Sequence, residues 1–300
     1  MEDPRLRVFV TVVDKGSFSK AARELHVTQP AVSLQVQNLE QYYGTRLLER
    51  DTVTLTPAGQ VLEQYARQIL DLYGQAGKEI SEMTGLVRGR LVVGASTTIG
   101  EYVLPCILGD FRKKYPQIEI LLRIGNTEMI GGLVTSNELD LGLVEGPVTR
   151  HRLKIERFMR DELVVIVPRH HPWSDKKEIS PQDLIMAQLI VREPGSGTRK
   201  VIEETLLSAG LDWGALNIEM ELGSSEAIKG AVEAGLGIGI ISKWTLLKEM
   251  KLGSLVPLRI AGLPIYRNFN MIYTTSKFLP TTTEQFIKNL RLYGHALPET

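Results

Sequence analysis

Apolar side chains recur at helical spacing from the start of the chain. Leu6, Phe9, Val10 and Val13 lie three or four positions apart, which places them on one face of an α-helix. Pro4 stands in the first turn, where its missing N–H breaks no intrahelical hydrogen bond. The spacing therefore predicts a helix from Pro4 to Val13 with one face turned toward a core.

Two more short helices are predicted after the first one. Ser17 is a typical N-cap for the apolar face over residues 18–25. Thr28 is placed to cap a third helix, which has Pro30 in its first turn and ends at Gly44.

A small hairpin is predicted next. Residues 47–48 and 53–55 are β-compatible pairs on either side of a polar turn. We expect this hairpin, or wing, to pack on the three helices.

A long apolar seam follows Pro57. Its members recur at steps of three or four over roughly 26 residues, which is about 39 Å of α-helix. They are Ala58, Leu62, Tyr65, Ile69, Leu72, Ala76, Ile80 and Met83. One interpretation packs this helix on its own domain, but residues 1–56 contain no comparable apolar segment to cover the seam. The seam therefore favours a dimerising, coiled-coil-like helix.

From Arg90 the pattern changes to strands that alternate with helices, after Gly85 and Gly89, which are typical of a hinge. The predicted strands are LVVGAS, IEILLRIGN, DLGLVEG, LVVIVP, QLIVREPG, IEMELGSS and IGIIS, and the predicted helices end at Lys114 and Leu139 or cover 198–209 and 226–234. Strand and helix in turn imply parallel sheets with right-handed crossovers. Because about 210 residues are many for one sheet, we expect two α/β lobes.

Composition and charge exclude only a few classes of protein. The chain has 35 basic and 35 acidic side chains, and residues 1–60 are balanced as well, so net charge gives no sign of nucleic-acid binding. A lone Cys106 and the absence of a signal-peptide pattern indicate a cytoplasmic protein. The most apolar runs, at 163–167 and 236–241, fall short of the roughly 20 residues of a membrane span, so no membrane contact is expected.

Uncharged polar side chains gather at the start of the third predicted helix. Gln29, Ser33, Gln35 and Gln37 are able to pair with base edges, as Gln does with adenine. Two short helices joined by a turn, the second opening with TQPAVS, are the pattern of a helix-turn-helix that enters the major groove. The alternative is an ordinary three-helix mini-domain. Sequence-independent contacts to phosphate would come from Lys20, Arg23, Arg46 and Arg50.

The amino-terminal run resembles a known family. The stretch FVTVVDKGSFSKAARELHVTQPAVSLQVQNLEQYYGTRLLER, followed by LTPAGQ, is similar to the signature of the LysR-type transcriptional regulators over residues 5–60. The resemblance implies a sequence-specific, DNA-binding transcriptional regulator controlled by a small effector. It also implies double-stranded operator DNA as a partner, a homodimer or homotetramer, and RNA polymerase as a further partner.

The fold class that this resemblance implies is α/β with an all-α winged helix-turn-helix. The expected domains are a DNA-binding domain at 1–58, a linker and dimerisation helix with its hinge at 59–89, and an effector-binding domain at 90–300. The last is expected to resemble periplasmic binding proteins, with lobe I at about 90–161 and 268–300 and lobe II at about 162–267.

The candidate DNA-binding residues follow from the motif and the resemblance. They are Thr28, Gln29, Pro30, Ser33, Gln35, Gln37 and Arg50, the last being the wing residue that would meet phosphate. The chain departs from the family pattern in two places. Leu34 stands where the family often has Arg or another polar residue, and the wing is about two residues shorter than usual.

Hydroxyl and amide residues mark four predicted strand-to-helix turns. The candidate effector-binding residues in these turns are Ser96, Thr97, Thr98, Asn126, Thr127, Gly195, Ser196, Gly197, Thr198 and Ser224. Taken singly each turn is typical of a helix N-cap, and Thr98 with Glu101 predicts a capping box. Together the turns end parallel strands, where helix amino termini direct free N–H groups into one crevice.

This crevice is suited to a small anion or carboxylate. The resemblance implies that the effector binds there, between the lobes. The PGSGT turn is also similar to that of family members governing sulfur metabolism, which suggests an inorganic sulfur anion.

Enzymatic interpretations fit the chain less well. The run Gly235–Gly239 is similar to a dinucleotide loop, but it follows a helix and precedes a strand, the reverse of the Rossmann order. His170 and His171 are adjacent and cannot face one site from a strand, so no metal or other cofactor is expected. Cys106 is expected to be a buried structural thiol. Two rival hypotheses remain: a receptor that acts through a protein partner, and an enzyme with its site in the cleft.

Overall fold

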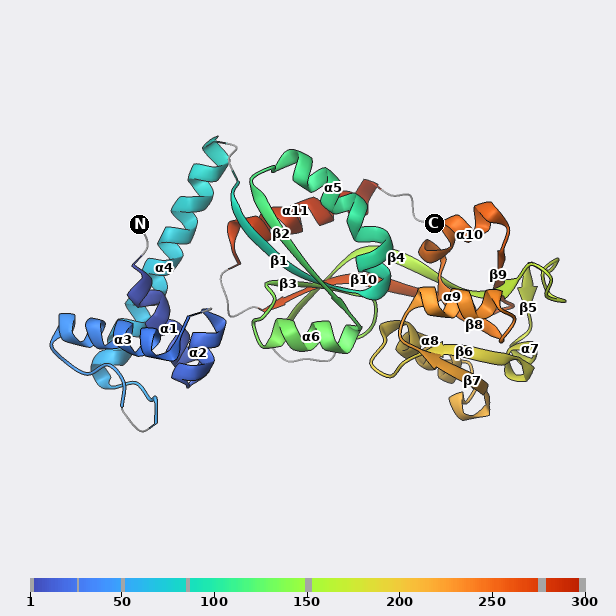
Figure 1. Cartoon of the computed structure of the whole chain (residues 1–300), viewed down its shortest axis with the longest axis horizontal. Coiled ribbons are helices and arrows are strands. Elements are labelled where there is room, and N and C mark those ends of the chain that lie inside the picture. The colour runs from blue at the N-terminus through green and yellow to red at the C-terminus, as the bar shows by residue number, and fades with distance from the viewer. Residues whose placement is uncertain are drawn as a thin grey trace. The chain divides into compact units, whose positions relative to one another are not determined.

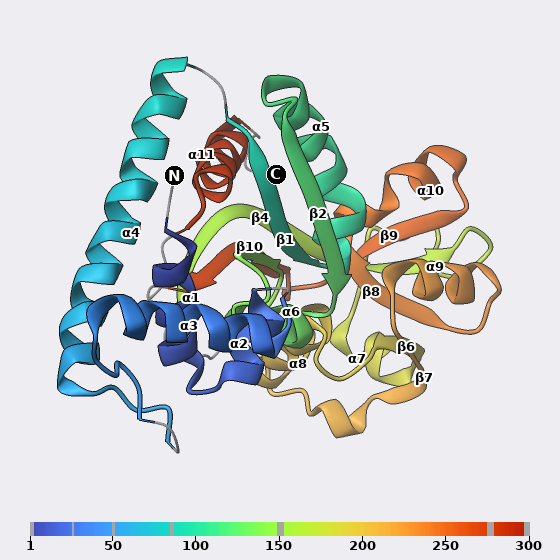
Figure 2. The same cartoon turned by 60° about the vertical axis from the view of Figure 1, so that its left-hand side comes forward.

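The structure is a computed structural model that describes residues 3–25, 27–49, 52–84, 87–148, 153–274 and 279–296. The chain divides into two compact units, Met1–Val87 and Arg88–Thr300 (Figures 1 and 2). Each unit has a hydrophobic core of its own.

The described part of the first unit is helical apart from the wing. Its helices are α1 (Pro4–Lys15), α2 (Phe18–Glu24), α3 (Gln29–Tyr43) and α4 (Pro57–Thr84), as the apolar spacing predicted. Ser17 caps α2 by accepting from the N–H of Lys20, and Gly44 ends α3 with a left-handed φ of 64°. Thr28 holds the N-cap position of α3, but the prediction that it caps the helix was wrong: its side chain accepts no capping hydrogen bond. Pro30 removes one of the two N–H groups that such a cap normally satisfies.

The core of the first unit joins the three short helices to the first turns of α4. Phe9, Val32 and Leu39 are almost completely buried, and α4 adds Leu62 and Ala66 to the same cluster. The amino-terminal half of α4 is therefore part of this unit's packing.

The wing is held to α3 by one carboxylate. Glu40 Oε1 accepts from the N–H of Leu47 at 2.8 Å and from the N–H of Leu48 at 3.3 Å. The predicted hairpin is present as a single bridge between Leu48 and Leu55. Arg50, the predicted phosphate contact, lies outside the described residues.

The second unit has two lobes that two long strands connect (Figure 1). Lobe I contains β1 (Gly89–Ser96), η1 (Ile99–Val103), α5 (Leu104–Lys114), β2 (Ile118–Gly125), α6 (Thr127–Thr135), β3 (Leu141–Val144) and α11 (Thr281–Ala296). Lobe II contains β5 (Glu178–Ile179), α7 (Pro181–Met186), β6 (Gln188–Arg192), α8 (Gly197–Ser208), η2 (Trp213–Ala215), β7 (Asn217–Leu222), α9 (Ser225–Glu233), β8 (Ile238–Ser242), η3 (Lys243–Leu246), α10 (Leu247–Leu252) and β9 (Leu255–Ile260). The connecting strands are β4 (Leu153–Pro168) and β10 (Ile265–Thr274).

The strands form a continuous path in the order β2-β1-β3-β10-β4-β8-β6-β7. The predicted parallel pairing holds within each lobe, where β1 pairs with β2 and β3, and β6 pairs with β7 and β8. The prediction was wrong for β4, which is antiparallel to β8, β9 and β10. β4 carries the chain from lobe I into lobe II and β10 brings it back, so the two strands run in opposite directions.

Two local expectations also need correction. The helix expected to reach Leu139 ends at Thr135, and Asn137 beyond it adopts a left-handed φ of 61° that a helix does not allow. Cys106 on α5 is exposed, not buried. The buried residues of α5 are Leu104, Ile107 and Phe111, and Cys106 lies off the face that they define.

Candidate functional site

The candidate DNA-reading residues lie on the first turns of α3. Those that are exposed are Thr28, Gln29, Pro30 and Gln37, and those that are partly exposed are Ser33 and Gln35. The Gln29 Nε2 donates to Ser33 Oγ at 3.4 Å, one helical turn away. Val32, Val36 and Leu39 hold the opposite face of the helix in the core. The exposed side chains of this set are therefore turned away from the body of the unit, whereas Ser33 and Gln35 lie at the two edges of the buried face.

Basic side chains on the first unit are also exposed. Lys20 and Arg23 lie on α2, and Arg46 lies just before the wing. Leu34 is 55% exposed among the polar residues of α3.

The seam predicted on α4 is only partly covered by its own unit. Leu62 is buried, whereas Tyr65, Leu72, Ile80 and Met83 are 57%, 62%, 61% and 86% exposed. A stripe of exposed apolar side chains along one helix is typical of a surface that another chain covers.

In the second unit the two lobes meet at the backbone of two glycines. A Cβ on Gly146, which follows β3, would lie 2.5 Å from the Cα of Gly197 at the start of α8. The N–H of Glu128 in lobe I donates to the carbonyl of Gly195 in lobe II at 3.2 Å. Residues with a Cβ could not approach so closely, so the lobes are closed on each other at this point.

Arg267 of β10 is a buried cation at the lobe junction, with only 1% of its side chain exposed. Its Nε donates to Asp161 Oδ2 at 2.7 Å, and its Nη1 donates to Thr198 Oγ1 at 2.7 Å. Its Nη2 donates to Thr98 Oγ1 at 3.4 Å and lies 3.5 Å from Glu145 Oε2. Thr98 belongs to lobe I and Thr198 to lobe II, so one guanidinium joins both lobes.

Asp161 is the close counterion of Arg267. Its second oxygen accepts from Ser242 Oγ at 2.8 Å. Burial raises the pKa of the Asp161 carboxyl, while the charge of Arg267 and the Ser242 hydrogen bond act against that shift.

Arg192, at the end of β6, is a second buried cation, with 1% of its side chain exposed. Its Nη1 donates to Thr97 Oγ1 at 3.0 Å across the lobe junction. Its Nε and Nη2 donate to the two carboxylate oxygens of Glu193 at 2.8 Å and 3.0 Å. These bonds fix the orientation of the guanidinium, with its Nη1 bonded to Thr97 of lobe I.

Predicted hydroxyl residues are buried around this junction. They are Ser96, Thr97, Thr98, Thr127 and Thr198. Among the described residues, Ser96 Oγ and Thr127 Oγ1 have no hydrogen-bond partner. The predicted capping box of Thr98 and Glu101 was wrong, because Thr98 has a helical backbone at φ −59° and makes no capping bond. Its hydroxyl accepts from Arg267 instead.

Three predicted residues serve as helix N-caps. Asn126, Ser196 and Ser224 each accept from the backbone N–H three positions later, in α6, α8 and α9. Asn126 also reaches the other lobe, where its Nδ2 donates to Glu193 Oε1 at 3.4 Å. The capping interpretation is therefore sufficient for Ser224, whereas Asn126 has a contact at the junction as well.

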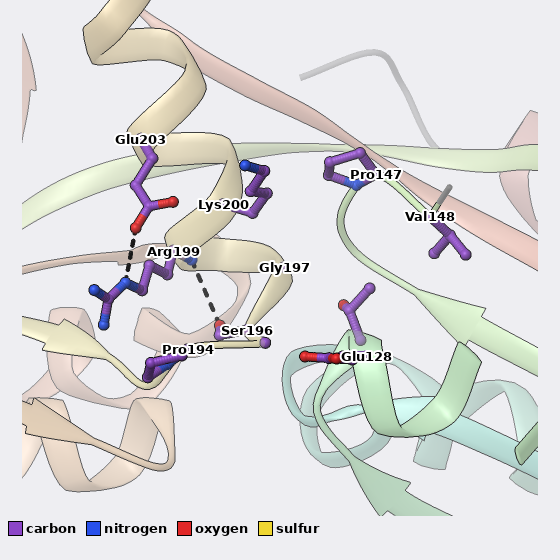
Figure 3. A pocket seen from close by; sticks show the side chains of 11 residues that line it. Glu128, Pro147, Val148, Pro194, Ser196, Gly197, Arg199, Lys200 and Glu203 are labelled. Carbon is purple, nitrogen blue, oxygen red and sulfur yellow. Dashed lines mark hydrogen bonds and ion pairs between the residues drawn. The ribbon is translucent and has the colours of Figure 1, made fainter. Parts of the chain in front are cut away.

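A pocket of about 420 Å³ opens at the same junction (Figure 3). Its lining consists of Thr127, Glu128, Pro147, Val148, Pro194, Gly195, Ser196, Gly197, Arg199, Lys200 and Glu203. Figure 3 shows Arg199 paired with Glu203 on α8, where the Nε to Oε1 distance is 2.8 Å. The predicted residues Thr127, Gly195, Ser196 and Gly197 line this pocket. The other predicted effector residues do not line it. Among them, Thr97 bonds to Arg192, and Thr98 and Thr198 bond to Arg267.

A further polar contact joins the lobes through η1 and α9. The Tyr102 hydroxyl donates to Glu226 Oε1, and Lys229 Nζ pairs with Glu226 at 2.8 Å and with Glu249 at 2.6 Å. Although burial acts in the other direction, hydrogen bonds from Lys229 and Tyr102 hold the pKa of Glu226 below its ordinary value. Burial and the bond to Glu226 raise the pKa of Tyr102.

Sequence reasoning missed the charged residues at the centre of the junction. Arg192, Arg267, Glu145 and Asp161 were not among the candidates. A charged residue directly after a run of apolar strand residues is a usable signal of a functional charge at the end of a buried strand. Arg192 and Glu145 both stand in such positions.

Two further features are absent from the described ranges. No group of three or more His, Cys, Asp or Glu side chains there is arranged to hold a metal ion. None of the helices in those ranges is long and apolar enough to span a bilayer.

Comparison with known families assigns both parts of the chain. Residues 4–60 match the family "Bacterial regulatory helix-turn-helix protein, lysR family". Residues 84–293 match the family "LysR substrate binding domain".

Curated relatives match over nearly the whole chain. A "Probable RuBisCO transcriptional regulator" of Emiliania huxleyi is 38% identical over 291 residues, which cover 95% of this chain and 93% of the relative. The "HTH-type transcriptional regulator CysL" of Bacillus subtilis is 37% identical over 288 residues, which cover 95% of each chain.

Solved structures share the fold. The CcmR regulatory domain of Synechocystis PCC6803, in complex with 2-PG, is 35% identical with a TM-score of 0.65, and the match covers 70% of this chain and all of that domain. A full-length OxyR variant from Pseudomonas aeruginosa has a TM-score of 0.65 at 23% identity, covering 99% of this chain and 95% of that one. The family matches and the relatives lead to one conclusion: the chain belongs to the LysR family of transcriptional regulators, with an amino-terminal DNA-binding domain and an effector-binding domain after it.

Proposed function

We propose that this regulator responds to a small anion held between the lobes of its second unit. The observation that carries the proposal is the pair of buried guanidiniums, Arg192 and Arg267, each hydrogen-bonded to a hydroxyl of lobe I. Buried arginines with polar neighbours are the usual partners of carboxylate and phosphate groups. An anion bound there would touch both lobes and so favour their closed arrangement.

The surrounding groups support the same ligand class. Ser96 and Thr127 have buried hydroxyls with unused hydrogen-bonding capacity, and α6 and α8 begin at the junction. Helix amino termini favour negative charge. Known relatives suggest chemistry of this kind, since the CcmR domain binds 2-PG. A phosphate, a carboxylate and an inorganic sulfur anion all belong to the proposed class.

The first unit is proposed to read operator DNA through the start of α3. Gln29, Ser33 and Gln35 would contact base edges, with Thr28 and Pro30 beside them at the start of the helix and Gln37 about two turns further along. Lys20, Arg23, Arg46 and the wing residue Arg50 would hold the phosphates.

Chain assembly is proposed to use α4. Its exposed stripe from Tyr65 to Met83 would pair with a second copy, giving a homodimer or, through further contacts, a homotetramer. Two DNA-reading units in one assembly fit a pseudo-palindromic operator. We further propose that the protein works in the cytoplasm, acts on RNA polymerase at the promoter, and catalyses no reaction of its own.

A competition titration tests the DNA-reading proposal. The full chain is titrated by fluorescence anisotropy against the DNA upstream of its own gene and against a scrambled duplex at one salt concentration. Gln29→Ala is expected to lower the discrimination between the duplexes by about 1–3 kcal/mol, because base contacts alone carry sequence preference. Lys20→Ala, the matched control, is expected to weaken binding to both duplexes equally. An equal loss for Gln29→Ala on both duplexes would contradict base reading by α3.

A further inference from the structure

Glu145 brings a negative charge into the proposed anion site. It follows β3 directly, and only 1% of its side chain is exposed. Its Oε2 lies 3.5 Å from Arg267 Nη2, and its Oε1 accepts from Thr198 Oγ1 at 3.5 Å. A carboxylate from the chain itself is therefore located at the cation and the lobe II hydroxyl that a bound anion would use.

The contacts of Glu145 are weaker than those of the second carboxylate at the same arginine. Asp161 is 2.7 Å from Arg267 Nε and accepts a 2.8 Å bond from Ser242. Both Glu145 contacts measure 3.5 Å, and its Oε2 has no hydrogen-bond partner among the described residues. Hydrogen bonds to a charged carboxylate normally measure about 2.7–2.9 Å from a cationic N–H and about 2.5–2.7 Å from a hydroxyl, so the polar contacts of Glu145 are weak.

The carboxylates already at Arg267 make the binding of a ligand anion there unfavourable. Arg267 carries one positive charge, while Asp161 and Glu145 each carry a carboxylate beside it. Arg192 is already paired with Glu193. A ligand anion added without any change would place three negative groups around Arg267 in a buried site, where like charges repel strongly.

We infer that Glu145 is a built-in competitor of the anionic effector. Its carboxylate occupies the anion position at Arg267 and Thr198, and the effector binds by displacing it. This inference rests on the proposed anion effector and names the residue that sets how tightly the effector must bind. Because Glu145 belongs to lobe I and Thr198 to lobe II, the displacement also replaces an interlobe contact of the protein by one through the ligand.

The competitor sets the same requirement for every ligand anion. An anion must form shorter bonds to Arg267 and Thr198 than Glu145 does in order to take its place. Groups with several oxygens around one centre, such as phosphate or sulfate, present more acceptors to the guanidinium and the hydroxyls than a single carboxylate. Such a preference for tetrahedral anions comes from the guanidinium and the hydroxyls, whereas displacing Glu145 raises the Kd of every anion by the same factor.

Calorimetric titration of the full chain with Glu145→Gln tests the inference. The probes are inorganic sulfate, inorganic phosphate, 2-PG and acetate. The variant keeps the shape of the side chain and removes its charge, so the Kd of every anion that binds the wild type is expected to fall by about tenfold or more. The gain is expected to be at least as large for sulfate and phosphate as for acetate, because displacement costs every anion the same free energy and repulsion by a carboxylate grows with ligand charge.

Glu128→Gln is the matched control. Glu128 lines the pocket of Figure 3, whose lining does not include Arg267 or Glu145, and its substitution removes an equal charge from the lobe junction. We expect less than a threefold change in Kd for this variant. Equal gains in anion affinity for both variants would mean that the loss of any nearby negative charge is sufficient, and would overturn the inference.

The outcomes separate the inference from the proposed function. If an anion binds the wild type and its Kd is unchanged or raised in Glu145→Gln, Glu145 is not a competitor. The proposal of an anionic effector is then still supported. No binding of any probe to either protein contradicts both. The melting temperature of each unliganded variant reports its folding, and Glu145→Asp, which shortens the carboxylate's reach, is a second variant with an expected gain of about threefold.

Discussion

Arg267 and Asp161 stand opposite each other on β10 and β4 as register partners, and their side chains meet at 2.7 Å between Nε and Oδ2. These two strands carry the chain from one lobe to the other and back. The ion pair is therefore located at the crossing between the lobes, where Arg267 also meets hydroxyls from both of them.

Arg267→Leu tests how much this buried pair contributes to folding. Removing one partner leaves Asp161 as an uncompensated buried charge, so we expect a loss of about 3–5 kcal/mol in the free energy of unfolding of the second unit. Denaturant unfolding followed by circular dichroism measures it. Arg259→Leu is the matched control, because the side chain of Arg259 is 59% exposed and its partner Glu162 keeps a second cation, Lys243, at 3.4 Å. A loss no larger than that of the control would contradict the role of the buried pair.

Gly146→Ala tests whether the lobes must close to hold an anion. The added Cβ would meet the backbone of Gly197 at 2.5 Å, which forces the lobes apart. Overpacking of this kind costs about 1–3 kcal/mol, so the Kd of a bound anion is expected to rise about tenfold or more. Gly230→Ala on α9 is the control, since its Cβ meets no atom within 4 Å. Calorimetry measures the Kd of both variants; a Kd for Gly146→Ala equal to that of the wild type and of Gly230→Ala would contradict the need for closure.

Leu72→Asp tests the proposed assembly surface on α4. Leu72 is 62% exposed in the middle of the apolar stripe, and a charge there would be buried without a partner in a paired helix. We expect the variant to become monomeric at micromolar concentration while its melting temperature stays close to that of the wild type. Sedimentation velocity gives the mass, and Gln60→Asp, on another face of α4, is the control. An oligomer of unchanged mass in Leu72→Asp would exclude this surface.

The first unit was largely predictable because its signals are local. Ser17, Gly44 and the apolar spacing of α1 to α4 act within a few residues of the structure that they determine. Thr28 was the exception, since the neighbouring Pro30 changes which N–H groups are available to cap.

The centre of the lobe junction was not predictable from local pattern. Arg267 shares the inward-facing positions of Ile265, Phe269 and Met271 in its strand, where the pattern predicts an apolar residue and gives no reason for a buried cation. It is buried because Asp161, 106 positions earlier, and Thr198 come to the same place in the fold. The hydroxyl turns were recognised because each one ends a strand, but the cations between them depend on the antiparallel course of β4 and β10.

Effector-linked DNA binding in the wild type and in Thr98→Val tests the central claim most directly. Operator affinity is measured by anisotropy with and without sulfate, phosphate or 2-PG, at constant ionic strength. We predict that at least one anion changes the wild-type affinity about threefold or more, and that Thr98→Val binds operator normally but does not respond. Thr205→Val removes a hydroxyl that donates to the carbonyl of Val201 within α8, and this variant is predicted to respond as the wild type does. An equal response in Thr98→Val, or none in the wild type with any anion, would contradict regulation through the interlobe site.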